Sequence, residues 1–233
     1  MPGTVTESPV TLQEYGSMTM QEREALWLEI SDITEEEFKA HMMREKDREV
    51  DVPGVGAYAP DFTADVLGDN RKRTGEKGVL AQLRGKPVGI AFGSFTWPPF
   101  RGKAVRLNEL YSKYGDRVQF YIIYIREAHP AAGWQVPNNL IENVIYDEPS
   151  TDAERTDVAS ACQINLGLKM PMLIDSIDND IDKKYVGLPM RQFLIDSEGK
   201  IAYAGEKGPF GWNDQAFEEE LQKLIEWTRD SKI

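Results

Sequence analysis

Residues 94–99, Ser-Phe-Thr-Trp-Pro-Pro, occupy a turn where chemistry is expected. They follow the apolar run 88–93, which predicts a buried strand, and they precede a helical pattern. In open α/β sheets, reactive groups lie at the carboxyl ends of such strands. Two prolines suit the first turn of a helix, and a side chain just before that turn faces the positive end of the helix dipole, which stabilises a thiolate or selenolate. Trp97 holds that position, and its indole is no nucleophile.

His129 is the second candidate, in a segment that follows the apolar run 118–125. An imidazole can hydrogen-bond a phenol oxygen or transfer a proton near neutral pH. A single histidine in a loop is more often a solvated or capping residue than a catalytic one. Exposed glutamates are also common, so Glu127 by itself does not indicate a function. Spacing alone therefore gives neither residue a role. His41, in a charged helical stretch, is given none.

Short β-branched or aromatic runs predict the strands that position these residues, at 88–93, 118–125, 170–175, 193–196 and 200–205. Helical patterns lie between the runs, and a C-terminal amphipathic helix opens with Asn213 or Asp214 as its cap. Glu198-Gly199 predicts a hairpin turn. The order βαβα, then a hairpin and a last helix, predicts an α/β protein of thioredoxin-like layout, with a mixed sheet and helices on both faces.

The N-terminal region differs from the rest of the chain. Residues 1–18 show no periodicity and predict a loose tail. Two capping boxes, at 19–22 and 34–37, predict two short helices. The second helix is mostly charged, with Phe38 and Met42 as its main apolar pair. We therefore expect it to lie on the surface, where it serves packing or homodimer formation.

A change of composition after Val52 predicts a domain boundary. Glycine and proline follow closely there, before a run of alternating apolar residues that reads as a linker leading into a strand. The sequence thus predicts an N-terminal tail and helical extension at 1–52 and a thioredoxin-like domain at 53–233.

Charge and composition exclude several classes of function. The 233 residues carry 27 Lys and Arg against 39 Asp and Glu, a net charge of −12 that repels nucleic acid and anionic membranes. No run approaches the ~20 uncharged residues of a membrane span. The first ten residues lack the pattern of a secretory signal. We expect a soluble cytoplasmic protein with neither nucleic acid nor membrane as a partner.

The single cysteine excludes an internal disulfide and a cysteine zinc site, and the acidic run at 175–182 does not fit a calcium-binding loop. One cysteine, Cys162, cannot form an internal disulfide, a cysteine zinc site or a CxxC pair. It falls on an apolar helical face, so we expect a buried thiol rather than a resolving one. The acidic run has alternate aspartates, but Lys183 and Pro189 stand where an EF-hand needs glycine and glutamate. We expect a solvated loop there and no metal site.

Three segments resemble iodothyronine deiodinases. GSFTWPPF, at 93–100, resembles that family's active-site signature, Gly-Ser-Cys-Thr-selenocysteine-Pro-Pro-Phe, and IYIREAHPAAGW, at 123–134, is similar to its Ile-Val-Tyr-Ile-Glu-Glu-Ala-His segment. LPMRQFLIDSEGKIAYAGEKGPFGWN, at 188–213, resembles its Leu-Pro-Glu-Arg-Leu-Tyr-Ile-Ile run and the hairpin that follows. The resemblance covers residues 57–225, and the first two motifs are specific to the family.

The resemblance implies a reductive oxidoreductase on a thioredoxin-like fold. A chalcogenolate at position 97 would take iodonium from an iodinated phenol, or attack a disulfide or peroxide, and an external thiol would regenerate it without another cofactor. Trp97 stands at the selenocysteine position and Phe95 at that of a nearby cysteine. The resemblance assigns catalytic roles to Trp97, His129 and Glu127, and substrate contacts to Thr96, Pro189 and Arg191.

Two of these residues carry structural expectations. Leu188-Pro189 resembles the cis-proline of thioredoxin folds, so we expect a cis bond with Pro189 packed near Trp97. Arg191 is expected either to pair with a substrate carboxylate or to form a surface ion pair.

Three explanations of Trp97 stay open. The selenocysteine codon UGA differs by one base from the tryptophan codon UGG, so recoding, mistranslation or mutation would place Trp there. A cysteine-type bacterial relative altered at this codon is the second explanation. The third is a genuine tryptophan, which makes the chain a catalytically inactive binding or scaffold protein that uses the same cleft, with Trp97 as an aromatic platform.

Overall fold

Three parallel strands form the centre of a seven-stranded mixed sheet in the computed structural model, which describes residues 7–68, 72–83 and 85–230. The strand order is β2-β1-β5-β4-β3-β6-β7, with β3, β4 and β5 parallel and the other pairings antiparallel. The strands are β1 (Thr63–Leu67), β2 (Arg73–Val79), β3 (Val88–Gly93), β4 (Gln119–Tyr124), β5 (Met172–Ile174), β6 (Arg191–Ile195) and β7 (Ile201–Ala204).

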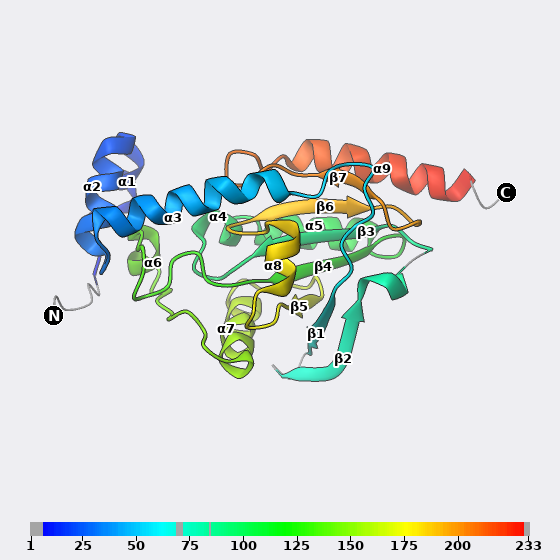
Figure 1. The fold of residues 1–233 in the computed structure, drawn as a ribbon, viewed down its shortest axis with the longest axis horizontal. Helices are drawn as coiled ribbons and strands as arrows, with labels where there is room; N and C mark the ends of the chain where they lie inside the picture. Colours follow the sequence, from blue (N-terminus) through cyan, green and yellow to red (C-terminus); the bar gives the residue numbers. More distant parts are fainter. Residues whose placement is uncertain (1–6, 69–71, 84, 231–233) are drawn as a thin grey trace.

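Helices cover both faces of this sheet, as the sequence predicts (Figure 1). They are α1 (Leu12–Ser17), α2 (Met20–Ile30), α3 (Glu35–Asp47), α4 (Pro98–Arg101), α5 (Ala104–Tyr114), α6 (Pro137–Ile141), α7 (Asp152–Asn165), α8 (Asp180–Tyr185) and α9 (Asp214–Asp230), with short 3-10 helices at Arg48–Asp51 and Leu80–Leu83. In α9, the Asn213 side chain accepts the Ala216 N–H and so provides the cap. None of the helices in the described part combines the length and apolarity that crossing a bilayer requires.

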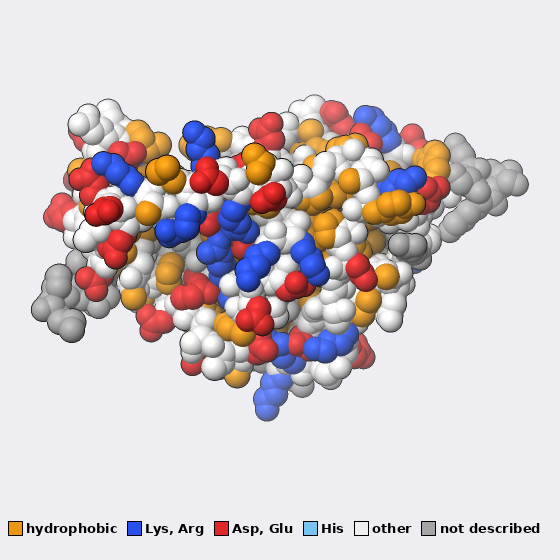
Figure 2. All heavy atoms as spheres, in the orientation of Figure 1, with side chains coloured by type: hydrophobic (Ala, Val, Ile, Leu, Met, Phe, Trp, Pro, Cys, Tyr) orange, Lys and Arg blue, Asp and Glu red, His pale blue; other side chains and the backbone are white. Residues whose placement is uncertain are grey.

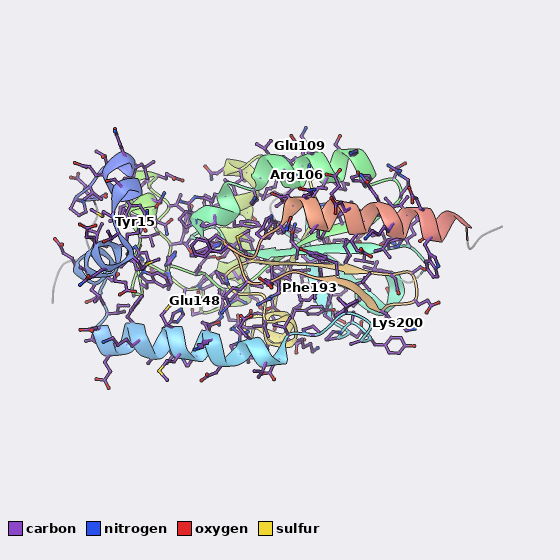
Figure 3. All side chains as sticks on the ribbon, turned by 90° about the horizontal axis from the view of Figure 1, so that it is seen from above. Tyr15, Arg106, Glu109, Glu148, Phe193 and Lys200 are labelled. Atoms are coloured by element: carbon purple, nitrogen blue, oxygen red, sulfur yellow. The ribbon has the colours of Figure 1, made fainter. Side chains whose placement is uncertain are left out.

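Side chains along the central strands point alternately to the two faces of the sheet, so the core consists of two layers. Every residue of β3 is buried; Ala91 faces a cluster with α5, α7 and α9, whereas Ile90 and Phe92 face a cluster with α8. Figure 3 shows α5 and α9 on one side of the sheet and α3 on the other. Burial on both faces explains why the strand reads as one continuous apolar run.

The N-terminal region is more ordered than the sequence predicts. The predicted loose tail contains α1, whose Thr11 and Glu14 form a capping box; residues 1–6 of that tail lie outside the described residues. The helices predicted after the boxes at 19–22 and 34–37 are confirmed as α2 and α3. Figure 1 shows α1 and α2 at the end of the molecule where α6 lies, and α3 running from there along the sheet.

Helix α3 lies on the surface, as its sequence predicts, but Phe38 and Met42 do not form a buried apolar pair. Phe38 is buried, but Met42 is 46% exposed. The second buried residue of α3 is Glu45, which accepts hydrogen bonds from Arg48 and Arg126. Both arginines also pair with Asp182 of α8. Figure 2 shows Lys and Arg side chains gathered below α3. Charge pairing as well as apolar packing therefore attaches α3 to the domain.

The acidic run at 175–182 is likewise not a solvated loop. Asp175 and Asp182 are almost completely buried. Asp175 accepts the backbone N–H groups of Ile181 and Asp182 at 2.9 Å, and Asp182 accepts that of Leu188 at 2.9 Å. The prediction failed because these carboxylates satisfy backbone donors at the start of α8 and before the strand β6, which sequence spacing does not reveal.

Candidate functional site

The turn after β3 places residue 97 at the start of a very short helix. Trp97 is the extended residue before α4, with Pro98 and Pro99 in its first turn. Phe100 of this turn packs so closely under β3 that a Cβ on Gly93 would lie 2.2 Å from its ring, so only glycine fits there. Because α4 has four residues, the helix dipole at position 97 is weaker than the sequence pattern suggests.

A buried carboxyl group lies beside the backbone of this turn. Glu127 Oε2 accepts the Thr96 hydroxyl at 2.7 Å and the Thr96 backbone N–H at 3.0 Å. Its other oxygen accepts the hydroxyl of Tyr124 at 2.5 Å. The Tyr124 oxygen in turn accepts the backbone N–H of Phe95 at 3.1 Å. These bonds connect the carboxyl end of β4 to the two residues that precede Trp97.

Burial sets the ionisation of this network. Glu127 is 4% exposed, and burial raises its pKa to about 7, although its hydrogen bonds from Tyr124 and Thr96 act in the opposite direction. Burial also raises the pKa of Tyr124 well above its usual range, with the Glu127 charge as a second cause. Near neutral pH, Glu127 is thus close to half protonated and can both release and accept a proton.

His129 is neutral and presents one free acceptor. Its Nδ1 lies 2.8 Å from the carbonyl oxygen of Trp134, which can only accept, so Nδ1 carries the proton. Burial lowers the His129 pKa to about 3. Its Nε2 has no hydrogen-bond partner among the described residues. Its ring centroid lies 5.2 Å from that of Trp97, at an interplanar angle of 34°. At neutral pH, His129 is an acceptor and not a proton donor at Nε2.

The structure brings four of the predicted site residues together, namely Thr96, Trp97, Glu127 and His129. The backbone N–H of His129 donates to Thr96 Oγ1 at 3.1 Å, which joins the histidine to the Glu127 network. The Leu188–Pro189 bond is cis, as expected. Contact between Pro189 and Trp97 stays a prediction.

Arg191 is buried and hydrogen-bonded within the protein, which differs from both expectations. It is 2% exposed. It donates to the carbonyls of Val186 and Gly205, each at 2.8 Å, and to both oxygens of Glu49. The guanidinium N–H groups of Arg191 already donate to acceptors within the protein. Arg191 therefore forms no ion pair on the surface and is not accessible to the carboxylate of a ligand. Its ion pair with Glu49 joins β6 to the end of the N-terminal extension.

The sequence alone did not identify the side chains that hydrogen-bond to the backbone of the turn at 94–97. Asn139 donates to the Thr96 carbonyl at 2.8 Å, and Arg101 donates to the Phe95 carbonyl at 2.8 Å and to Asn139 at 2.9 Å. Ser94 Oγ accepts the backbone N–H of Ala128 at 3.2 Å. Arg101 and Asn139 sit in short helices without periodicity, so the sequence offered no signal for either residue.

Cys162 contributes no nucleophile to this site. It is fully buried on α7, as predicted, and burial raises its thiol pKa well above the usual value. Among the residues that the structure describes, no group of three or more His, Cys, Asp and Glu side chains is arranged to hold a metal ion.

Comparison with known proteins decides the family. A sequence profile of iodothyronine deiodinases matches residues 33–226, which include the turn at position 97 and the segment of Glu127 and His129. The chain belongs to the iodothyronine deiodinase family. Its match begins at residue 33, within the N-terminal extension, before the predicted boundary at Val52. The family resemblance of the three sequence segments is therefore confirmed.

Individual deiodinases match part of the chain. Type I iodothyronine deiodinase of Xenopus laevis is 31% identical over 141 residues, which are 59% of this chain and 52% of that protein. Type II iodothyronine deiodinase of Homo sapiens is 30% identical over 142 residues, 59% of this chain and 51% of that protein. The chain spans about half the length of the curated deiodinases that it matches.

Solved structures confirm the thioredoxin-like fold of this deiodinase-family chain. The thioredoxin domain of a thiol-disulfide oxidoreductase from Bacteroides vulgatus gives a TM-score of 0.50 at 16% identity, covering 73% of this chain and 98% of that one. A hypothetical protein from Sinorhizobium meliloti gives 0.53 at 18% identity, covering 74% of this chain and 85% of that one.

Proposed function

We propose that this site performs reductive chemistry at position 97, namely deiodination of an iodinated phenol or reduction of a disulfide or peroxide, when that position carries selenocysteine or cysteine. The observation that carries the proposal is the buried network of Tyr124, Glu127 and Thr96 around the turn. Burying a carboxyl group costs stability. A carboxyl group whose pKa burial raises to about 7 is suited to proton transfer near neutral pH.

The proposed reaction has two halves. The thiolate or selenolate takes iodine as iodonium: the carbon–iodine bond breaks, a sulfur–iodine or selenium–iodine bond forms, and the ring carbon keeps the electron pair and takes a proton. Two molecules of an external thiol then reduce this intermediate to the free thiolate or selenolate, and yield one disulfide, one iodide and two protons. Regeneration suits a compartment with a thiol pool, which agrees with the expected cytoplasmic location.

The chain's own residues fit separate tasks in this reaction. His129 Nε2 is an acceptor without a partner in the described part of the chain, and its ring lies beside that of Trp97. In our proposal it accepts a hydrogen bond from the phenol O–H of the substrate. Glu127, with a pKa of about 7, supplies the proton for the ring carbon through the Thr96 hydroxyl. Deiodination therefore divides between an acceptor that polarises the ring and a neighbouring acid.

A second candidate is a binding or scaffold protein without turnover. Trp97 itself favours it, because the indole packs against His129 and leaves the site without a nucleophile. In this case the Trp97 and His129 rings would form a platform for an aromatic or thiol-bearing ligand.

The coding triplet at position 97 is the first test, because UGA and UGG separate selenocysteine from tryptophan directly. The second test compares Trp97→Cys with Trp97→Ser, which opens the same space without a redox-active atom. We expect Trp97→Cys, supplied with a small dithiol, to turn over an iodophenol, a disulfide or a peroxide, and Trp97→Ser to be inactive. If neither variant turns over any of the three substrates, the binding function replaces the redox function.

A further inference from the structure

The ring of Trp134 lies between His129 and the N-terminal extension. Its centroid is 4.5 Å from that of His129, at an angle of 87°. On its other sides it meets Trp27 of α2 at 5.0 Å and Phe38 of α3 at 5.1 Å, both edge to face. The His41 ring of α3 lies 6.2 Å away. A continuous row of rings thus runs from the extension through Trp134 to His129 and on to Trp97.

The backbone at Trp134 is held from the same two sides. Its carbonyl oxygen accepts the Nδ1–H of His129, which selects the tautomer. The next residue, Gln135, donates its backbone N–H at 2.7 Å to Ser31 Oγ at the end of α2. Ring packing from Trp27 and Phe38 and this hydrogen bond therefore fix where the Trp134 carbonyl lies.

We propose that Trp134 is a positioning residue for His129, and that the N-terminal extension completes the active site by clamping Trp134 through Trp27 and Phe38. The effect on His129 can be tested in the chain as it stands, with Trp97 in place. The effect on turnover rests on the proposed function.

The physical reason is that a neutral imidazole can place its proton on either nitrogen. Only the Trp134 carbonyl makes Nδ1 the protonated atom and leaves Nε2 as the acceptor. Without the clamp, Trp134 moves, water reaches the ring and both tautomers become populated. Desolvation of His129 then weakens, which favours the protonated ring, whereas the charges that face it, Arg101 and His41, still oppose protonation.

Imidazole nitrogen NMR tests this directly, because the chain contains only two histidines. In the original chain, His129 is expected to show one neutral tautomer with the proton on Nδ1. Trp134→Leu and Phe38→Leu should give a mixture of tautomers and a higher ionisation pH. Trp134→Phe, which keeps an aromatic edge against His129, should retain the original pattern.

The matched control is Leu26→Ala, which removes a buried side chain from the same extension where it packs with Ile30 and Leu140. Melting curves identify the variants that stay folded; if Trp134→Leu unfolds, Phe38→Leu decides. The proposal is overturned if the folded variants keep the pure Nδ1–H tautomer. It is equally overturned if Leu26→Ala disturbs the tautomer as much as Phe38→Leu does.

Kinetics provide the second readout, in the Trp97→Cys background. Phe38→Leu should lower kcat for an iodophenol by about 10- to 100-fold, the loss typical of a misplaced reacting group, while KM and the rate of thiol alkylation stay nearly constant. If Trp97→Cys turns over nothing, the proposed function fails while the NMR result still decides the role of Trp134. If turnover is present and Phe38→Leu leaves kcat unchanged, the extension does not complete the site.

Discussion

Arg191 Nη2 donates to both carboxylate oxygens of Glu49, at 3.0 and 2.8 Å. Glu49 lies in the 3-10 helix that ends the N-terminal extension, and Arg191 begins β6, two residues after the cis-proline. The pair thus joins the extension to the central sheet. Because Arg191 is 2% exposed, the loss of its partner would leave a buried charge without a counterion.

We expect Glu49→Ala to destabilise the fold by about 1–3 kcal/mol, less than the cost of breaking a fully buried ion pair, because the Glu49 side chain is 35% exposed. The control is Glu198→Ala, which removes a partner of Lys200 from an exposed pair and should cost less than about 1 kcal/mol. Urea unfolding of both variants measures the difference. Equal midpoints for Glu49→Ala and Glu198→Ala would show that Arg191 needs no counterion.

Glu127 should make the fold less stable as the pH rises. Its pKa is about 7 in the folded protein against 4.5 for an exposed glutamate, so between these pH values the folded state binds more protons than the unfolded state. The free energy of unfolding of the original chain, minus that of Glu127→Gln, should therefore fall by about 3 kcal/mol from pH 4.5 to pH 7. Unfolding curves at several pH values check this slope. A flat difference would mean that Glu127 ionises normally.

His129 should have the opposite effect on stability. Its pKa is about 3 when folded and 6.5 when exposed, so the unfolded state binds the extra proton in this range. Stability due to His129 is complete above pH 6.5 and is lost as the pH falls toward 3. The unfolding free energy of the original chain, measured against His129→Gln, should decrease by up to about 5 kcal/mol over this range. An increase on acidification would contradict a neutral buried ring.

Turnover of an iodophenol by Trp97→Cys, divided by the thiolate fraction that alkylation measures at each pH, should decrease above pH 7. The proposed acid must be protonated, and the pKa of Glu127 is about 7, so the active fraction declines as the pH rises through that value. Glu127→Gln in the same background should lower kcat by at least about 100-fold and remove this decline. Alkylation of the introduced thiol serves as the control, since it needs no proton donor. A decline that persists in Glu127→Gln belongs to another group.

Cys162 should react with a bulky thiol reagent only after unfolding. The side chain is fully buried, and burial raises its pKa, so both access and thiolate formation are suppressed. Labelling followed by mass spectrometry should be slow in buffer and complete within the unfolding time in urea. Rapid labelling of the native chain would show that α7 opens readily.

The reactive turn and its partner strand could be predicted because their signals are local. β3 is buried on both faces and reads as an unbroken apolar run that ends at Gly93, and Trp97 stands just before α4. Thr96 and His129 follow neighbouring parallel strands, β3 and β4, whose carboxyl ends meet at one edge. Strand prediction and the family motifs therefore indicated the same group of residues.

What could not be predicted depends on partners far apart in the chain. Tyr124 reads as one more aromatic core residue, and only the fold directs its hydroxyl at Glu127. Arg191 forms an ion pair with Glu49, which lies 142 residues earlier, so no local sequence pattern reveals this contact. Trp134 likewise owes its position to Trp27 and Phe38. Side-chain pairing of this kind is specified by three-dimensional packing and not by periodicity.

Strand β2 has a consequence for how the protein behaves at high concentration. It forms one outer edge of the sheet and carries Arg73, Glu76 and Lys77, with Gly75 in a left-handed conformation between them. Arg73 and Lys77 both pair with Asp65 of β1. A strand from a neighbouring molecule could add here only by desolvating these charges on a twisted edge. Fibril growth from β2 is therefore disfavoured, whichever residue stands at position 97.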